Sequence, residues 1–474
     1  MATLDPLLTD AMNRAAVHAL EYRSAVDEGP QRPALNYAQM VARFTEALPE
    51  TGRSADEIVD RLVDLATPGL HKSAGPRFFG WVIGNSHPVG VAADWLTSAW
   101  GQNAGNQTAS PAAAACEVVA AQWLLELLDL PRAASVGFVT GATMANFVCL
   151  AAARSEVLRR VGWDVDAQGL FGAPPIHVLI GDEAHATVYS ALQYLGLGHA
   201  RVCRVATDSQ GAIVPAEFER TLEQLPNGPL IAILQAGQIN TGAFDDFGQM
   251  VPMVKARGGW VHVDGAFGLW ARACPPHAPL SSGLEHADSW ATDGHKWLQT
   301  PYDCGYAIVR DAQAHERAMS INASYLPAAQ GERDPSHFVP ELSRRARGFP
   351  TWALIAHLGQ RGIAAMVERH VLLARLMAER LSDLPGVAVL NKVVLNQVIV
   401  RFGVDNGPAE ADRLTRATIA RVQADGECFT GGAQWRGQWV MRISVIGFET
   451  QEEDALRATG AIARAWATVK AGAV

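Results

Sequence analysis

Lysine is scarce in this sequence of 474 residues. Only five of its 39 basic residues are lysine, and all the others are arginine. A lysine inside an apolar segment is therefore conspicuous, and Lys296 stands in one. The formal net charge of -9 argues against a nucleic-acid-binding surface.

Long apolar runs and paired cysteines are missing as well. No segment approaches the roughly 18 uninterrupted apolar residues of a membrane span, and residues 1–25 lack the basic start and apolar run of a secretory signal. The six cysteines are scattered without a C-x-x-C pair or a metal-finger spacing. We therefore expect free thiols in a reducing, cytoplasmic compartment, with no membrane contact and no metal.

The composition and length favour a compact α/β enzyme of two domains with an N-terminal extension. Hydrophobic residues make up 49% of the chain, charged residues 18%, and 43 residues are glycine. Residues 1–78 are predicted to form a helical extension that packs on a partner subunit. Residues 79–350 are predicted to form the large domain, and residues 351–474 a smaller α+β domain.

Short apolar strands alternate with helices in the large domain. The expected strands are SVGFV, HVLIGD, ARVCRVA, LIAILQAG, GWVHVD and DSWATD, with helical stretches such as 187–195 and 215–225 between several of them. This alternation predicts a mostly parallel sheet with helices on both faces. Beyond residue 350 one long helix is expected, followed by strands and two further helices.

Two apolar segments between residues 260 and 304 end in polar and charged residues that are normally exposed to solvent. His262 and Asp264 close the first segment, and His295 and Lys296 follow the second. Unpaired, each of these groups would cost several kcal/mol at the edge of a buried sheet, so a functional site is the simplest explanation. A lysine paired with an acidic residue suits pyridoxal phosphate (PLP), with Asp264 beside the ring nitrogen.

Other residues support this hypothesis only in combination. The turn at residues 139–143 lies between a strand and a helix and could surround an anion, or be a simple tight turn. His185 follows another strand and could lie on the cofactor ring, or be a hydrogen-bonded core histidine. His262, Asp264 and His295 could instead bind a metal, but Lys296 would then have no role.

Six ordered motifs carry a resemblance to a known family: SPAAAACEVVAAQWL, GFVTGATMANFVCLAAAR, DEAHATV, AGQINTGAFDDF, WVHVDGAFGLWA and ADSWATDGHKWLQTPYDCG. They resemble the group II PLP-dependent decarboxylases, which act on aromatic amino acids, histidine, tyrosine or glutamate. The resemblance covers roughly residues 70–450. It implies fold type I, the aspartate-aminotransferase-like α/β architecture, with a large, mostly parallel sheet of the seven-stranded type and a smaller C-terminal α+β domain. It also implies a cytoplasmic homodimer with active sites at the subunit boundary.

The resemblance assigns roles residue by residue. Lys296 would hold PLP covalently, Asp264 would pair with the pyridinium nitrogen, His185 would stack on the ring and Ala266 would touch its other face. The remaining cofactor contacts would be Gly141, Ala142 and Thr143 at the phosphate, helped by His295 and Thr292, with Asn240 and Thr241 beside the ring. The substrate would meet Trp81, Val82, Asn103 and Arg442.

The sequence departs from the family at residues 328–349. Aromatic decarboxylases of this family carry a proton-donating tyrosine there, whereas this stretch has none and Pro335 stands at the matching position. His337 could take the acid role, or be a plain exposed histidine; the nearest tyrosine is Tyr325.

Decarboxylation of an L-amino acid to the amine and CO2 is the expected reaction. The alternatives are decarboxylation with oxidation to an aldehyde, transamination, and a catalytically inactive binding protein. Phe78, Phe79 and Trp81 favour an apolar or aromatic substrate, whereas Asn103 and its neighbours Asn106 and Gln107 could bind a polar one.

Overall fold

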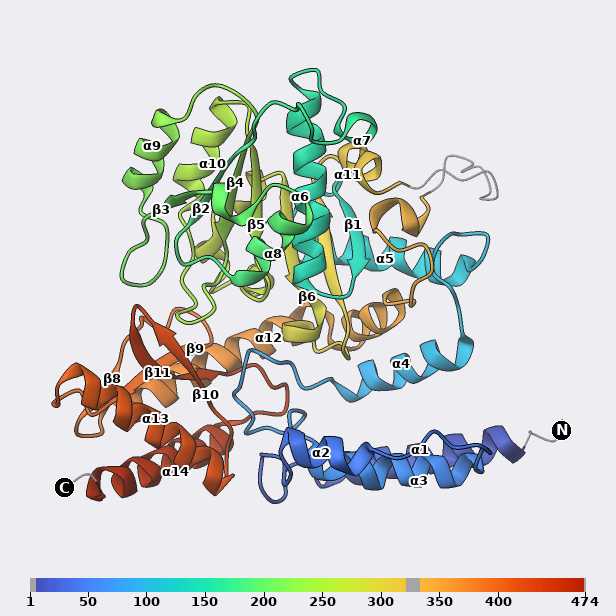
Figure 1. The fold of residues 1–474 in the computed structure, drawn as a ribbon, viewed down its shortest axis with the longest axis vertical. Helices are drawn as coiled ribbons and strands as arrows, with labels where there is room; N and C mark the ends of the chain where they lie inside the picture. The colour runs from blue at the N-terminus through green and yellow to red at the C-terminus, as the bar shows by residue number, and fades with distance from the viewer. Residues whose placement is uncertain (1–5, 321–332, 473–474) are drawn as a thin grey trace.

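A seven-stranded sheet forms the centre of the larger part of the protein (Figure 1). The computed structural model describes residues 6–320 and 333–472. The strand order is β1-β7-β6-β5-β4-β2-β3, and only β7 runs against the other six strands. The prediction of a large, mostly parallel sheet is therefore confirmed. The strands are β1 (Ser135–Val139), β2 (His177–Gly181), β3 (Cys203–Val205), β4 (Leu230–Gln235), β5 (Trp260–Asp264), β6 (Ser289–Asp293) and β7 (Gly305–Val309).

Helices cover both faces of this sheet, because alternate side chains of each buried strand point to opposite sides. On β4, Ile231 and Ile233 belong to one core, whereas Ala232 and Leu234 belong to the other. The first core includes α6 (Ala142–Arg159), α8 (Ala186–Tyr194) and α11 (Ala312–Met319). The second includes α5 (Pro111–Leu127), α9 (Pro215–Gln224) and α10 (Phe247–Ala256); the short α7 (Val165–Gln168) follows α6.

The C-terminal part is a four-stranded antiparallel sheet with helices, drawn in orange to red in Figure 1. Its strand order is β10-β11-β9-β8. A third core lies between this sheet and its helices and includes Phe79 from the N-terminal part of the chain. The elements are β8 (Val387–Val389), β9 (Gln397–Phe402), α13 (Pro408–Asp425), β10 (Gly431–Trp435), β11 (Gln438–Ser444) and α14 (Glu452–Ala471).

One long helix, α12 (Gly348–Ser382), joins the two parts. The sequence predicts it as a continuous helix, but Gly359 has non-helical angles (φ 60°, ψ 175°) and splits it into two limbs. Ile363 and Val371 pack in the core of the large sheet, whereas Leu373 and Leu381 pack in the C-terminal core. Because α12 serves both cores, the predicted division at residue 350 stays a prediction.

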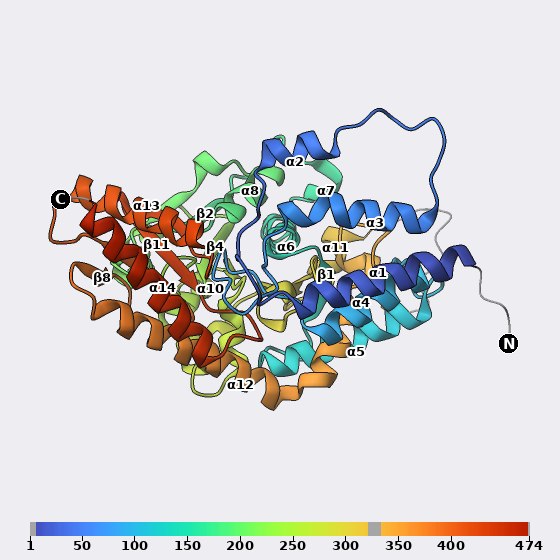
Figure 2. The ribbon, with the colours of Figure 1, turned by 90° about the horizontal axis from the view of Figure 1, so that it is seen from below.

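The N-terminal helices form an arm beside the main body (Figures 1 and 2). The arm comprises α1 (Pro6–Ser24), α2 (Tyr37–Phe44) and α3 (Ala55–Ala66), and α4 (Pro88–Trp100) follows it. Helices α2 and α3 bury no residue completely, and several large apolar side chains of the arm face solvent, among them Leu20 and Leu62. Within the described residues, no helix is both long and apolar enough to cross a bilayer.

Candidate active site

The predicted site residues meet at one edge of the large sheet. Because β1, β5 and β6 run in the same direction, their carboxyl ends bring Asp264, Asp293 and the turn at Gly141 to the same edge. His185 comes from the same edge, since it follows β2 and begins α8.

Lys296 lies in a π-helical turn, η6 (Gly294–Leu298), immediately after β6. Its Nζ atom is 2.9 Å from Oδ2 of Asp293. The other oxygen, Oδ1, accepts the N–H of Ala142 at 2.5 Å and lies 3.3 Å from Nε2 of His295. Asp293 therefore connects the lysine, the histidine and the start of α6, a role that the sequence analysis missed.

His295 is fixed from both sides. Its Nδ1 atom accepts the N–H of Cys304 at 3.2 Å, so in the neutral ring the proton is on Nε2, facing Asp293. Burial lowers the pKa of His295. Its ring stacks on Tyr302, with centroids 4.2 Å apart. Burial and the nearby Asp293 charge raise the pKa of Tyr302, so this second missed residue presents a protonated phenol.

Asp264 is almost completely buried and weakly hydrogen-bonded. Oδ1 accepts the N–H of Ala266 at 3.2 Å, and Oδ2 accepts Nδ2 of Asn146 at 3.4 Å. Burial raises the pKa of Asp264, while the proximity of His185 and Lys296 opposes that shift. Because burial disfavours the charged form of this carboxylate, a cation placed beside it would stabilise that form strongly.

His262 is linked to Asp264 through Asn146, and its two ring nitrogens are not free to bind a metal. Its Nε2 atom is 2.8 Å from Oδ1 of Asn146, and its Nδ1 atom is 2.9 Å from Oγ of Ser289. Burial lowers the pKa of His262 to about 3, so the ring is neutral. The alternative of a metal held by His262, Asp264 and His295 therefore loses one of its ligands.

A family model described as the pyridoxal-dependent decarboxylase conserved domain matches residues 38–402. The chain belongs to this family. Tryptophan decarboxylase 1 of Oryza sativa subsp. japonica is 26% identical over 99% of this chain and 95% of its own length. Phenylacetaldehyde synthase of Arabidopsis thaliana is 24% identical over 91% of this chain and 90% of its own length.

The crystal structure of Oryza sativa TDC with PLP and tryptamine has the same fold. Its TM-score is 0.90 at 23% identity, over 98% of this chain and 99% of that one. The prediction of a fold type I, PLP-dependent amino-acid decarboxylase is therefore confirmed.

The decarboxylase site offers PLP a fitting set of groups. A Cβ atom at Gly141 would lie 3.1 Å from Oδ1 of Asp293 and 2.9 Å from Cε1 of His295, so only glycine leaves room at this turn. With Ala142 and Thr143, the turn forms the N-terminus of the 18-residue helix α6, where backbone N–H groups favour an anion. Lys296 would supply the amine and Asp264 the buried negative charge.

His185 and Arg442 add a neutral ring and a partly buried cation. His185 caps α8 by accepting the N–H of Thr187 at 3.3 Å, and burial lowers its pKa. The charge of Arg442 lowers the pKa of His185 further. Arg442 donates to the carbonyl of Ile239 at 2.8 Å, and burial lowers its pKa to about 10. Its buried Nε atom has no hydrogen-bond partner among the described residues. An anionic group of the cofactor or substrate would satisfy it.

The other predicted cofactor contacts are occupied by protein partners. The backbone N–H groups of Asn240 and Thr241 donate to Oε1 of Gln238, at 2.6 and 3.1 Å. The Thr292 hydroxyl, which is fully buried, donates to the carbonyl of Ala266 at 3.4 Å. Their roles toward PLP stay predictions.

Trp81 and Val82 lie in a strained segment that passes beside Lys296. Both have positive φ, 53° and 59°, which is rare for a tryptophan and rarer for a β-branched valine. A Cβ at Gly84 would overlap the carbonyl oxygens of His295 and Lys296, so this segment runs directly along the η6 backbone. Such strain is common at functional sites. Trp81 lies 5.1 Å from the ring of Phe429, which stacks on Phe78 at 4.8 Å.

Asn103 and His337 lie apart from this group. Asn103 accepts the N–H of Arg344 at 3.1 Å. His337, in the 3-10 turn η7 (Pro335–Phe338), has its Nδ1 atom 3.3 Å from Oε1 of Glu316 on α11. Within the described parts of the chain, neither contacts Lys296, Asp264 or His185. Tyr325 lies outside the described residues.

Proposed function

We propose that this decarboxylase converts an aromatic L-amino acid into the corresponding amine and CO2. The observation that carries the proposal is the group formed by Lys296, Asp264 and His185 beside a segment rich in aromatic rings. Phe78, Trp81 and Phe429 form a cluster of rings with centroids 4.8–5.9 Å apart. Trp81 is the exposed member, and it precedes Gly84, which runs along the η6 backbone. Relatives named for tryptophan, tyrosine and aromatic L-amino acids support the same substrate class.

The residues divide the chemistry between them. When bound through Lys296, PLP supplies an electron sink for the pair left behind by CO2. Asp264 holds a proton at the ring nitrogen with its buried charge. His185, neutral at pH 7, orients the reacting carboxylate from its fixed position at the start of α8. Gly141, Ala142, Thr143 and His295 hold the phosphate.

A proton must return to the substrate Cα, and two side chains are candidates. His337 is the candidate from the sequence, acting from the segment that follows residues 321–332. Tyr302 is the candidate from the structure, since its protonated phenol stacks on His295. We expect His337→Phe or Tyr302→Phe to lower amine formation while the bound-cofactor absorption stays. If one of the two variants forms amine at the wild-type rate, the residue substituted in it does not donate the proton.

The central assignment is tested by the colour of the protein. Wild-type enzyme with PLP is expected to absorb near the visible edge. Borohydride reduction is expected to remove this band and to leave the cofactor attached to Lys296 as a stable label. Because only four other lysines are present, peptide mapping locates the label directly. A Lys296→Ala variant that keeps the same band would overturn the assignment.

The substrate class is tested with a panel of amino acids. Tryptophan, tyrosine and phenylalanine are expected to release CO2 and amine in equal amounts, and glutamate to react far more slowly. Faster turnover of glutamate than of every aromatic substrate would refute the proposal.

An aldehyde product is the second candidate. It is favoured by the missing tyrosine at residues 328–349 and by the relative named phenylacetaldehyde synthase. Peroxide formation and oxygen uptake measured beside the amine separate the two products. Amine without peroxide excludes the oxidative reaction for that substrate.

We also propose a cytoplasmic homodimer whose N-terminal arm packs on the partner subunit. The exposed apolar side chains of the arm and of α4 support the dimer. The six free thiols support a reducing compartment.

A further inference from the structure

A tight turn of four residues follows the strand that carries Asp264. The turn is Cys274-Pro-Pro-His277, between the 3-10 helices η3 (Gly268–Ala273) and η4 (Ala278–Ser281). The N–H of His277 donates to the carbonyl of Cys274 at 2.9 Å. Because each proline fixes its own φ, the turn presents the Cys274 and His277 side chains from a stiff backbone.

A third donor reaches this turn from helix α12. Oε2 of Glu368 lies 2.9 Å from Nε2 of His277 and 3.4 Å from Sγ of Cys274. The thiol, imidazole and carboxylate atoms all lie within 4.8 Å of one another. Cys274 is 1% exposed and His277 5%, whereas about a third of the Glu368 side chain reaches solvent.

The buried Nε2 atom of His277 has no hydrogen bond to any described residue. Glu368 is close to it, but the approach of 2.9 Å does not meet hydrogen-bond geometry and leaves Nε2 unsatisfied. A buried imidazole nitrogen without a hydrogen bond carries a free-energy penalty of about 1–3 kcal/mol. The His277 nitrogen and the Glu368 oxygen are therefore close together without forming a hydrogen bond. Two ligands of one metal ion have the same relation, because each directs its lone pair at the ion.

We propose that Cys274, His277 and Glu368 bind a zinc ion. Zinc takes thiolate, imidazole and carboxylate ligands in tetrahedral geometry, with bonds of about 2.0–2.3 Å that place neighbouring ligand atoms about 3.3–3.6 Å apart. The distances of 2.9 and 3.4 Å need only small side-chain adjustments to reach these values. The thiol proton leaves to solvent as the Sγ–Zn bond forms. A water molecule from the exposed side of Glu368 completes the tetrahedron.

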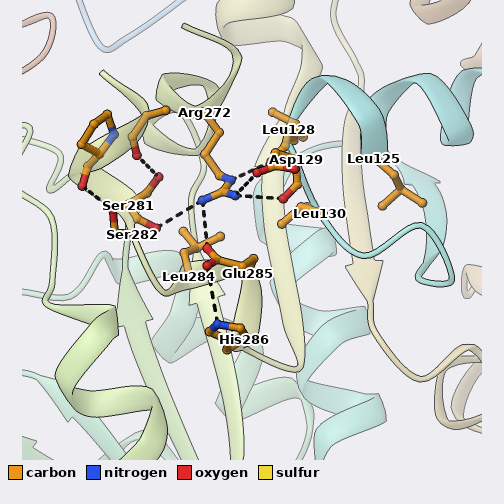
Figure 3. A network of polar contacts seen from close by, with 12 residues as sticks. Leu125, Leu128, Asp129, Leu130, Arg272, Ser281, Ser282, Leu284, Glu285 and His286 are labelled. Carbon is orange, nitrogen blue, oxygen red and sulfur yellow. Dashed lines mark hydrogen bonds and ion pairs between the residues drawn. The ribbon is translucent and has the colours of Figure 1, made fainter. Parts of the chain in front are cut away.

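The site fastens the segment after β5 to the long helix α12. On its other side, this segment is held by Arg272, whose guanidinium donates to the carbonyl of Leu128 at 2.7 Å and to Asp129 at 2.9 Å (Figure 3). Arg272 also contacts Glu285 at 3.1 Å. Zinc would give the segment that leaves Asp264 a second anchor, outside the PLP site.

Metal binding is tested on the tag-free holoenzyme. We expect one zinc per chain by mass spectrometry of the metal content. After chelation, cobalt(II) is expected to give tetrahedral d–d bands in the red, away from the absorption of PLP, together with a rise in Tm. Zinc far below one per chain and no cobalt bands would show a hydrogen-bonded cluster only, and would overturn the proposal.

Variants locate the ion. Cys274→Ser and His277→Gln are expected to lose the metal and the bands, and Glu368→Gln to weaken binding. The matched controls are Cys203→Ser and His286→Gln, which lie outside the cluster and are expected to bind like the wild type. Full binding by Cys274→Ser and His277→Gln would overturn the assignment. If these two variants do not fold, the proposal is tested by the zinc content and cobalt(II) bands of the wild type and by the weaker metal binding expected of Glu368→Gln.

Discussion

At the scale of single residues, burial fixes the charge state of the groups around Lys296. Burial lowers the pKa of His185, His262 and His295, which keeps these rings neutral at pH 7. The opposite shift at Asp264 makes this carboxylate depend on a nearby cation. Arg442, whose pKa of about 10 keeps it charged at pH 7, places a cation beside these neutral rings.

His185 caps α8, and we propose that it also orients the reacting carboxylate. His185→Asn keeps an N-cap acceptor, whereas His185→Ala removes it at a cost of about 1 kcal/mol. We expect both variants to lose at least about tenfold in kcat, and only His185→Ala to lower the Tm. A His185→Asn enzyme with wild-type kcat would exclude the catalytic role.

Asp245 gives a prediction for the pH dependence of stability. It is buried beside the site and accepts the N–H groups of Ile213 and Gln235, both at 2.7 Å, and burial raises its pKa to about 7. A pKa above the unfolded value of about 3.9 means that the folded state binds the extra proton. The contribution of Asp245 is therefore complete below about pH 4 and is lost as the pH rises through 7.

The test compares the Tm of the wild type with that of Asp245→Asn between pH 4 and pH 8. The amide side chain does not titrate, so the wild-type Tm is expected to fall relative to the variant as the pH rises. A difference in Tm that is constant, or that grows in favour of the wild type with rising pH, would contradict the raised pKa.

Sequence reasoning singled out Asp264, which ends a strand, and Lys296, which follows one, because a charged side chain directly after an apolar run is visible in the sequence. Asp293 also ends a strand, but its role depends on the distance to the amide of Ala142, which comes from another element. Tyr302 was missed because its stacking on His295 depends on the path of the chain after η6.

At the scale of elements, the sequence pattern predicted the parallel strands of the large sheet but missed two antiparallel strands. β7 (Gly305–Val309) and β10 (Gly431–Trp435) were not predicted, since only the pairing with their neighbours defines them. The break in α12 was missed because a glycine inside a helical pattern is often tolerated without a break. Only the positive φ of Gly359 reveals it.

Gly359 offers a clean test of that break. A Cβ there meets no atom of the described residues within 4 Å, so Gly359→Ala adds only the strain of a backbone conformation that is essentially restricted to glycine, about 1–3 kcal/mol. We expect a lower Tm with unchanged PLP absorption. Gly362→Ala is the matched control: its φ is not positive, and alanine in a helix is expected to be neutral or to stabilise by up to about 1 kcal/mol. Equal Tm values for the two variants would contradict the break.

At the scale of the whole molecule, apolar surface on α4, α5 and α12 calls for a covering partner. A hollow of about 470 Å³ is lined by Leu96, Trp100 and Trp352, each more than 40% exposed. Contiguous apolar surface of this kind marks interaction sites.

We expect the wild type to have the mass of a dimer in light scattering and Leu96→Arg to shift the mass toward the monomer. Phe171→Arg is the control, because Phe171 is 99% exposed but lies outside this hollow. A monomeric wild type, or a Leu96→Arg variant that remains fully dimeric, would refute this interface.

The helix α12 also determines how the subunit comes apart. Its second limb places Ile363 and Val371 in one core and Leu373 and Leu381 in the other, within a single run of helical hydrogen bonds. Neither core can melt without fraying the helix on which the other depends. Amide protons of the two sheets are therefore expected to exchange in one cooperative opening rather than in two, so the cofactor site and the C-terminal sheet share a single stability.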